Sequence, residues 1–481
     1  MKRTGINIET IAPATVSTSA MTSSLLDNAA YYGSILAPII GYVALFGYLF
    51  TNNDASSLSS SLDYILYFSK FLWFTGFLVV IANIIGLLIY GSPRNKELTN
   101  REQFLEQGGW NPRKRLVVTY VSRGDNVKAL ERSITASSTV LNNLGIEHMI
   151  DVVTDVNVAD QVKNTLNTHF HVVPEDYTTS SNTKYKARAL HYLVEARKKP
   201  QHHSAAHPDT WILHLDEESV VTESAIVGIH NFINAPVNRK RIGQGEIKYN
   251  AHQYNQNLLI TATDSIRTGD DLGRFRFQYK LTERPLFGMH GSFVLVPAAI
   301  EHAIGFDLSP EQSITEDAYF AFKAADRGIK FGWVDGYIQE QSPFTVMEIL
   351  KQRRRWFNGL MFLAFDQGIK LQTRALLMVN MLLWTIAWLG PIVTIVNLIA
   401  GGGYFPTALA LTAALLQGGY AAIYLVGAYR NLQNTNFSFM KKLGIYLATF
   451  ILTPIANVVE GLSVLYALIS PVRGFHVVRK N

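Results

Sequence analysis

Apolar residues gather toward the two ends of this 481-residue chain, and a mixed, charged region separates them. Residues 34–50 and 71–90 are uncharged apolar runs close to the length of a membrane-spanning helix. Further apolar stretches lie at about 375–400, 405–428 and 443–470. Because the region between these groups is long enough for a core of its own, the pattern predicts a soluble domain inserted between two sets of membrane helices.

The same pattern sets the expected domain limits. Residues 1–30, rich in Ser, Thr and Ala, are expected to form a disordered N-terminal tail. After it we expect two transmembrane helices within 31–92, an α/β domain within 100–343, an amphipathic interfacial helix within 344–372, C-terminal transmembrane helices within 373–470 and a basic tail over 471–481. The chain is therefore expected to be an integral membrane protein.

Positive residues indicate how the chain is oriented. Lys2 and Arg3 precede the first apolar run, and Arg94, Lys96 and Arg101 follow the second, whereas residues 51–63 between the two runs contain no Lys or Arg, and Lys70 at the outer end of the second run can reach the headgroups. Positive residues are concentrated on the cytosolic side of membrane proteins. We therefore expect the N-terminus and the central domain to face the cytoplasm.

The last apolar stretch conflicts with this orientation. If 443–470 crossed the membrane once, the basic tail that begins at Arg473 would lie outside, against the charge rule. Pro454 and Glu460 offer a place for a break in the stretch. We therefore predict that it folds as two short or re-entrant helices, which return residues 474–478 to the cytosolic face.

The central domain alternates strand-like and helix-like segments. Strands are expected at Arg115–Ser122, Glu147–Asp155, His169–Pro174 and Trp211–Leu215, with helices ending near Leu144, over Tyr185–Lys198 and from Thr222 to near Ala235. This rhythm predicts a Rossmann-like, doubly wound parallel sheet, which binds ligands at the carboxyl ends of its strands. Arg123, Asp155 and Asp216 fall at such ends, and the sequence contains neither a P-loop nor a G-x-G-x-x-G motif.

The strand that ends at Leu215 is followed at once by Asp216, Glu217 and Glu218. In an extended chain, Asp216 and Glu218 point to the same side and Glu217 points away. Two such carboxylates suit Mg²⁺ or Mn²⁺, which keep other coordination sites for water and a diphosphate. An ordinary acidic loop at a strand end explains the run equally well.

Two further motifs admit both a chemical and a structural interpretation. Lys186 and Arg188 lie near a helix start, where they oppose the helix dipole, so they suit phosphate binding better than helix stability; solvated surface cations remain the alternative. Glu316 and Asp317 also open a helix, where a carboxylate can serve as general base. Taken alone, this pair is explained more simply as acidic residues that offset the helix dipole.

A basic amphipathic helix precedes the C-terminal apolar stretches and contains Gln352-Arg353-Arg354-Arg355-Trp356. Such a helix is typical of the membrane interface. Contact with lipid headgroups would explain the arginines but not Gln352 or Trp356. The chain has no cysteine, a formal net charge of +6 and no dense basic tract, so nucleic-acid binding is not expected. Anionic lipids and a phosphate-bearing substrate account better for the positive charge.

In this order and spacing, Asp155, the Lys-Ala-Arg-Ala-Leu run, Asp-Glu-Glu, Thr-Glu-Asp and Q-x-x-R-W resemble inverting, membrane-embedded glycosyltransferases of the family-2 type. Longer strings are similar to egghead-type β-1,4-mannosyltransferases over roughly residues 115–365: WILHLDEESVVTES, TGDDLGRFRFQYK, HGSFVLVP, ITEDAYFAFKAADRG and QSPFTVMEILKQRRRWFNG. The resemblance implies a GT-A-like fold, GDP-mannose as donor, a lipid-linked or glycan acceptor and a β-1,4 linkage.

The resemblance also implies expected roles for individual residues. Ser122, Arg123 and Asp155 would contact the nucleoside, Lys186 and Arg188 the diphosphate, and Asp216 and Glu218 the metal, with Asp216 also near the donor. Asp317, beside Glu316, would be the catalytic base, and Gln352, Arg355 and Trp356 would close the donor site. His290, Gly291 and Ser292 would line the acceptor pocket with Trp356, although a turn before a strand explains His290–Ser292 equally well.

Two other functions stay open at this point. A processive polysaccharide synthase that uses a UDP-sugar would share the same motifs but would secrete its polymer through the helices. A non-enzymatic transporter or channel would need ionisable residues inside the bundle, for which Glu460 is the clearest candidate.

Overall fold

The strand-like segments of the central region form one mixed sheet. The computed structural model describes residues 18–50, 58–162, 167–199, 209–400 and 403–472. Within these ranges the sheet has seven strands in the order β3-β2-β1-β4-β6-β5-β7. Their bounds are β1 Arg115–Ser122, β2 His148–Thr154, β3 Thr168–Val172, β4 Thr210–Asp216, β5 Arg241–Lys248, β6 Val294–Pro297 and β7 Lys330–Gln339.

The expected parallel sheet is correct for only part of this arrangement. Strands β1 to β4 pair in parallel, and so do β5 and β7, but β6 runs antiparallel to both of its neighbours, β4 and β5. Strands β5 and β7 were not expected from the sequence, and β6 was expected only as the strand that a turn at His290–Ser292 would precede. The short β6 directly follows the loop that contains His290. Because β6 runs antiparallel to β4, the start of β6 lies beside the carboxyl end of β4, and this loop therefore lies at that end.

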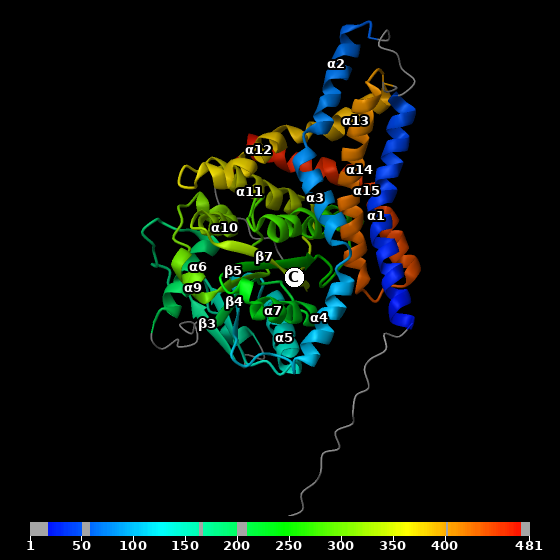
Figure 1. Cartoon of the computed structure of the whole chain (residues 1–481). Coiled ribbons are helices and arrows are strands. Elements are labelled where there is room, and N and C mark those ends of the chain that lie inside the picture. Colours follow the sequence, from blue (N-terminus) through cyan, green and yellow to red (C-terminus); the bar gives the residue numbers. More distant parts are fainter. Residues whose placement is uncertain (1–17, 51–57, 163–166, 200–208, 401–402, 473–481) are drawn as a thin grey trace, which may run out of the picture.

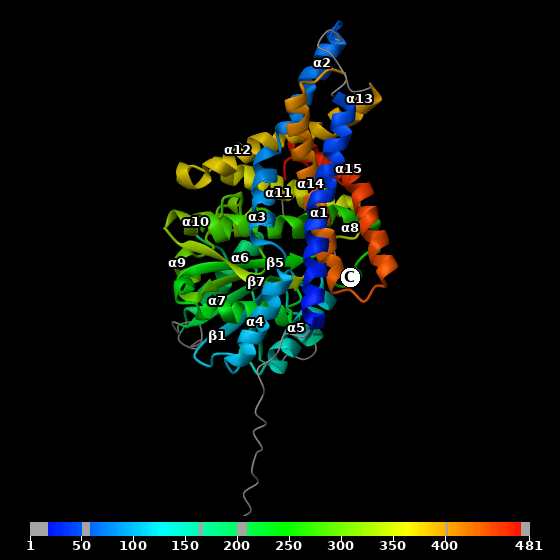
Figure 2. The same cartoon turned by 45° about the vertical axis from the view of Figure 1, so that its right-hand side comes forward.

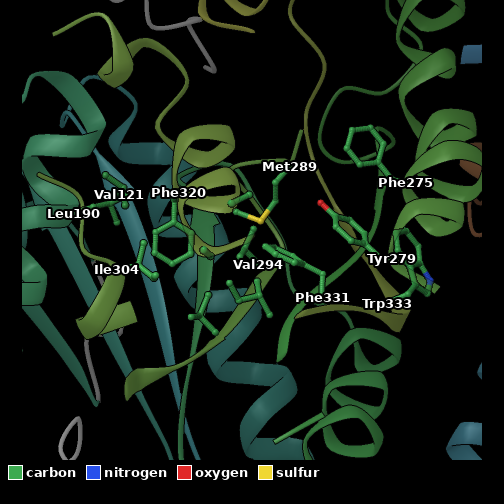
Figure 3. Packing of buried hydrophobic residues seen from close by; sticks show 14 of the residues in the cluster. Val121, Leu190, Phe275, Tyr279, Met289, Val294, Ile304, Phe320, Phe331 and Trp333 are labelled. Carbon is green, nitrogen blue, oxygen red and sulfur yellow. The ribbon is translucent and has the colours of Figure 1, made fainter. Parts of the chain in front are cut away.

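Helices cover both faces of the sheet. On one face α5 and α7 pack through Leu130, Ile134 and Ile226, and on the other α6 and α10 pack through Leu190 and Phe320. Figure 3 shows part of the second core, where Met289 lies between Phe320 and Tyr279. The helices of this domain are α5 Val127–Asn143, η3 Ala159–Gln161, α6 Tyr185–Arg197, α7 Glu223–Asn234, η4 Pro236–Asn238, α8 Leu258–Asp270, η5 Asp271–Phe275, η6 Gln278–Thr282, α9 Ala298–Ile304, η7 Gln312–Thr315 and α10 Glu316–Asp326.

The apolar ends of the chain form a bundle beside this domain (Figures 1 and 2). Among the described residues, four helices are long and apolar enough to cross a membrane, or five if a pair bent by 42° counts as one span. The two members of that pair are Ser61–Phe74, which comprises α2 and η2, and Phe77–Tyr90, which is α3. The bundle and its connections comprise α1 Thr18–Phe50, α2 Ser61–Ser69, η2 Lys70–Phe74, α3 Phe77–Tyr90, α4 Arg94–Glu106, α11 Val346–Phe365, α12 Leu371–Ala387, α13 Leu389–Ile399, α14 Thr407–Gln433 and α15 Phe439–Ile469.

The first helix begins earlier than expected. Residues 18–30 were expected to belong to a disordered tail, but they are helical; residues 1–17 lie outside the described ranges. Asp27 explains the difference, because its carboxylate accepts hydrogen bonds from Ser92, Tyr429 and Gln433 at 2.5 Å each. These partners are distant in the sequence, so composition alone could not show that this segment is held in place.

The predicted break in the last apolar stretch is absent. Helix α15 continues through Pro454 from Phe439 to Ile469. Proline is tolerated in apolar helices when nearby groups satisfy the backbone. The helix ends against α11, where Arg354 donates to the Pro471 carbonyl at 3.0 Å. Residues 474–478 lie outside the described ranges, so their predicted return to the cytosolic face is untested.

The domain and the bundle touch backbone to backbone where α8 meets α14. A Cβ atom at Gly427 would lie 1.7 Å from the Ser265 carbonyl oxygen, and one at Gly269 would lie 1.9 Å from the Ile423 carbonyl oxygen. Small residues permit this close approach between helices. Because α8 leads directly into the loops of the site, the contact fixes the site relative to the bundle.

Candidate active site

A cavity of about 440 Å³ lies at the carboxyl ends of β1, β2 and β4 and continues between the bundle helices. Its domain side is lined by the predicted residues at the strand ends, among them Arg123, Asp155 and Asp216. Its other side, called the bundle arm below, is lined by residues of the bundle helices, including Trp73, Val80, Trp384, Trp388 and Leu416. The cavity therefore joins a charged end to an apolar end.

The acidic run does not continue the strand as its expected alternation assumed, because β4 ends at Asp216 and Glu217 and Glu218 lie in a turn, which the Ser219 amide closes by donating to the Asp216 carbonyl at 3.0 Å. Asp216 and Glu218 line the cavity. Glu217 lies there too, and its carboxylate accepts hydrogen bonds from Ser122 and Asn126. Burial raises the pKa of Glu217 to about 7, with the charge of Glu218 adding to the effect. Ser122 thus lies in the site as a hydrogen-bond donor to Glu217, and its expected contact with the nucleoside stays a prediction.

Lys186 connects the two acidic motifs. Its ammonium lies 2.5 Å from Asp216 Oδ1 and 3.4 Å from Glu316 Oε1, and it donates to the Gly291 carbonyl at 3.2 Å. Although burial opposes the charge, these carboxylates raise the pKa of Lys186 above its ordinary value. A cation that remains charged at this point suits a diphosphate.

Asp317 stands beside this lysine in the first turn of α10. Burial raises its pKa to about 7, and the charge of Glu316 raises it further, while Lys186 opposes the shift. The Ala318 amide donates to Asp317 Oδ1 at 2.7 Å and holds the carboxyl in place. A carboxylate with a pKa near neutrality can accept a proton at working pH.

Arg188 lies behind the site instead of in it. Its guanidinium donates to Asp155 at 3.0 Å and to the carbonyls of Pro174, Glu175 and Tyr177. It is not among the residues that line the cavity, whereas Asp155 and Arg123 are. The geometry therefore favours an indirect role, in which Arg188 orients Asp155, over the direct diphosphate contact that was expected.

The His290–Ser292 loop both lines the cavity, as a binding loop would, and supports the neighbouring strand, as a structural turn would. His290 lines the cavity, and its Nε2 lies 3.0 Å from Asp271 Oδ1, while burial lowers its pKa to about 3 and keeps the ring neutral. Ser292 supports the end of β4, because its hydroxyl lies 2.7 Å from that of Ser219 and accepts from the Asp216 amide at 3.4 Å. Gly291 leaves room for both charged groups: a Cβ there would lie 2.8 Å from Lys186 Nζ and 2.9 Å from Asp317 Oδ2.

Helix α11 brings the Q-x-x-R-W motif over the cavity, between α10 and α12 (Figure 1). Gln352, Arg355 and Trp356 all line the cavity, and Arg355 donates to the Ile314 carbonyl at 3.4 Å. The structure thus brings these residues together with Asp317, Lys186 and Asp216, as expected. A helix that served only for headgroup contact would not place them there.

Five charged residues that line the cavity were given no role in the site from the sequence: Arg267, Asp270, Arg274, Glu340 and Arg353. Glu340 directly follows β7, the same signal that identified Asp216, but β7 itself was not recognised. Burial raises its pKa to about 7, and the charges of Asp216 and Glu218 add to the effect. Arg267 and Arg353 carried no local signal, because nothing in a helical sequence shows which partner covers each face.

The residues fit the expected divalent cation, although they do not form a complete cage. Among the described residues, no group of three or more His, Asp or Glu side chains is arranged to hold a metal ion. Asp216 and Glu218 nevertheless line the same cavity beside Lys186. Two carboxylates are sufficient for Mg²⁺ when phosphate oxygens and water supply the remaining ligands.

The chain is similar in sequence to known proteins over most of its length. The family model described as "Glycosyl transferase family group 2" matches residues 211–452. The β-1,4-mannosyltransferase egh of Drosophila melanogaster is 29% identical over 423 residues, which cover 87% of this chain and 88% of the relative. The β-1,4-mannosyltransferases bre-3 of Caenorhabditis briggsae and Caenorhabditis elegans are each 30% identical over 419 residues, covering 85% of this chain and 87% of the relative.

Proposed function

Because this chain belongs to glycosyl transferase family group 2 and is a glycosyltransferase with a GT-A-like, mixed α/β fold, we propose that it transfers mannose from GDP-mannose. In this proposal the acceptor is a hydroxyl of a lipid-linked sugar, and the transfer inverts the anomeric carbon to give a β-1,4 linkage. The relatives named β-1,4-mannosyltransferases support the choice of sugar and linkage, since they match most of the chain.

The observation that carries the proposal is the position of Asp317. Its carboxyl, with a pKa near 7, lies in the same cavity as the cations and carboxylates at the strand ends, and the bundle arm opens from that cavity. A base there can remove the proton of an acceptor hydroxyl while that oxygen attacks the anomeric carbon. The nucleoside diphosphate departs from the opposite face, which gives inversion in one displacement.

The remaining groups act on the departing diphosphate. Lys186 and Arg355 supply positive charge near the place where negative charge develops. A Mg²⁺ or Mn²⁺ ion held by Asp216 and Glu218 would add Lewis-acid stabilisation of the diphosphate when bound. Trp356 offers an aromatic face for a sugar ring.

The bundle arm supports a lipid-linked acceptor. Its lining is rich in apolar and aromatic side chains, including Trp73, Trp384 and Trp388, and it leads toward the catalytic carboxyl. A membrane lipid could place its apolar part in this arm and its sugar beside Asp317. The charge flanks of the first two apolar runs support a cytoplasmic position for the domain, with Arg94 and Lys96 on that side.

A transfer assay on the purified protein tests this proposal. The protein is offered GDP-mannose, UDP-glucose or UDP-N-acetylglucosamine together with a glucosyl lipid, and both nucleotide release and lipid product are measured. We expect turnover with GDP-mannose, a single added β-linked mannose by NMR, and none with Asp317→Asn. Turnover of a UDP-sugar in its place, or a polymer in place of a single addition, would overturn the assignment.

A further inference from the structure

We propose that Arg353 is a positioning residue: it orients Gln352 and Trp356 in the donor site and is itself anchored by Asp264 of α8 and Glu460 of α15. The inference rests on the proposed role of Gln352 and Trp356 at the donor. It also gives Glu460 a function different from the transporter role that its sequence position suggested.

Arg353 lies at the centre of four contacts. Its side chain is 4% exposed, and it donates to Asp264 Oδ1 at 2.7 Å and to Glu460 Oε1 at 2.9 Å. It also donates to Gln352 Oε1 at 2.7 Å, and its guanidinium lies 4.4 Å from the centre of the Trp356 ring. The guanidinium of Arg353 therefore joins two anchoring carboxylates, those of Asp264 and Glu460, to two residues of the Q-x-x-R-W motif.

The anchors are suited to holding a fixed geometry. A planar guanidinium with its donors in a rigid fork keeps its orientation when two carboxylates bind it from different sides. Asp264 is 1% exposed on α8 and Glu460 belongs to α15, so two elements distant in the sequence set the direction of the fork. A buried arginine without these partners would be left as an uncompensated charge.

The fork determines what the motif presents to the cavity. Because Gln352 Oε1 accepts from Arg353, the amide nitrogen of Gln352 is the group left to offer hydrogens to a ligand. Hydrogen-bond donors are what the oxygen-rich diphosphate and sugar of a donor require. Two guanidinium groups lie near the centre of the Trp356 ring, that of Arg353 and, at 4.8 Å, that of Arg267.

The adjacent Arg354 provides a matched control. It joins the same two helices, because it donates to Ser470 at 3.2 Å and lies 4.3 Å from the Tyr466 ring on α15. It makes none of the contacts with Gln352 or Trp356 described above, and it does not line the cavity. Loss of Arg354 therefore weakens the docking of α11 on α15 without changing the orientation of the motif.

The experiment compares Arg353→Lys, Glu460→Gln and Arg354→Lys in the full-length protein, and checks by gel filtration that each is folded. GDP binding is measured by calorimetry, and KM for the nucleotide sugar and for the acceptor are measured separately. We expect Arg353→Lys to raise the GDP dissociation constant and the donor KM by about tenfold, the scale of one charge-assisted hydrogen bond. Glu460→Gln should raise them by a smaller factor, while Arg354→Lys and the acceptor KM should change less than about twofold.

A double-mutant cycle separates positioning from packing. If Arg353 acts through Gln352, the donor-binding losses of Arg353→Lys and Gln352→Ala should fall well short of additivity. The inference is overturned if the losses add, if Arg353→Lys and Arg354→Lys impair donor binding equally, or if Arg353→Lys and Glu460→Gln leave GDP affinity unchanged. Failure of the wild-type protein to bind GDP would instead refute the proposed donor.

Discussion

Replacing Asp317 with Asn removes the proposed base with almost no change in shape. The Ala318 amide can still donate to the side-chain oxygen, a bond of 2.7 Å in the structure, so the start of α10 should keep its geometry. General-base catalysis contributes about 10²–10⁴-fold in rate, or about 3–5 kcal/mol of barrier. We therefore expect Asp317→Asn to bind GDP normally and to lose transfer by at least about a hundredfold.

The pH dependence gives the same prediction a second test. Because the pKa of Asp317 is raised to about 7 from an ordinary value of 3.8, protonation of this group stabilises the folded protein, fully at low pH. This stabilisation is lost as the pH rises from about 4 through about 7. Transfer by the wild-type protein should increase over the upper part of this range, and Asp317→Asn should be at least as stable as wild type above pH 7.

The competing explanation predicts the opposite pattern. If Asp317 serves only to offset the helix dipole, the substitution should cost about 0.3–1 kcal/mol of stability and leave the rate unchanged. Glu223, in the first turn of α7 and paired with Arg101 at 2.7 Å, is the control for such an effect. Single-turnover transfer and thermal unfolding are measured on Asp317→Asn and Glu223→Gln. An Asp317→Asn protein that is active but less stable would refute the assignment of the base.

Three further outcomes are expected. A chelator should abolish transfer and Mn²⁺ or Mg²⁺ should restore it; full activity of Asp216→Ala in chelator would exclude the metal site. Gly291→Ala should lower the transfer rate by at least about tenfold, because a Cβ would lie 2.8 Å from Lys186 Nζ and 2.9 Å from Asp317 Oδ2 and displace groups that need close positioning; an unchanged rate would show that these groups adjust freely. Although α15 is unbroken, its end lies against α11, where Arg354 donates to the Pro471 carbonyl at 3.0 Å and where the motif residues of the cavity are found; a tag placed after Asn481 should therefore resist external protease in sealed, right-side-out vesicles, and its cleavage would place the tail outside.

The local sequence pattern was sufficient to predict those site residues whose position depends only on where a strand ends. Strand-end positions identified Asp155 and Asp216 as cavity residues, because parallel strands of one sheet end at the same edge. The alternation expected beyond Leu215 did not hold, because β4 ends at Asp216 and Glu217 and Glu218 lie in a turn. The motif resemblance added Asp317, Gln352 and Trp356, which the fold brings to the same cavity.

The sequence by itself thus determined the class of protein, the charged end of the site and the apolar helices around it. Tertiary structure alone decided that α15 continues through Pro454, that β6 runs antiparallel, and that Arg353 turns inward while Arg354 faces the end of α15. The physical reason is the same in each case. Hydrophobic period and chain stiffness act within a few residues, whereas the partner that covers a helix face or satisfies a buried charge comes from an element far away in the chain.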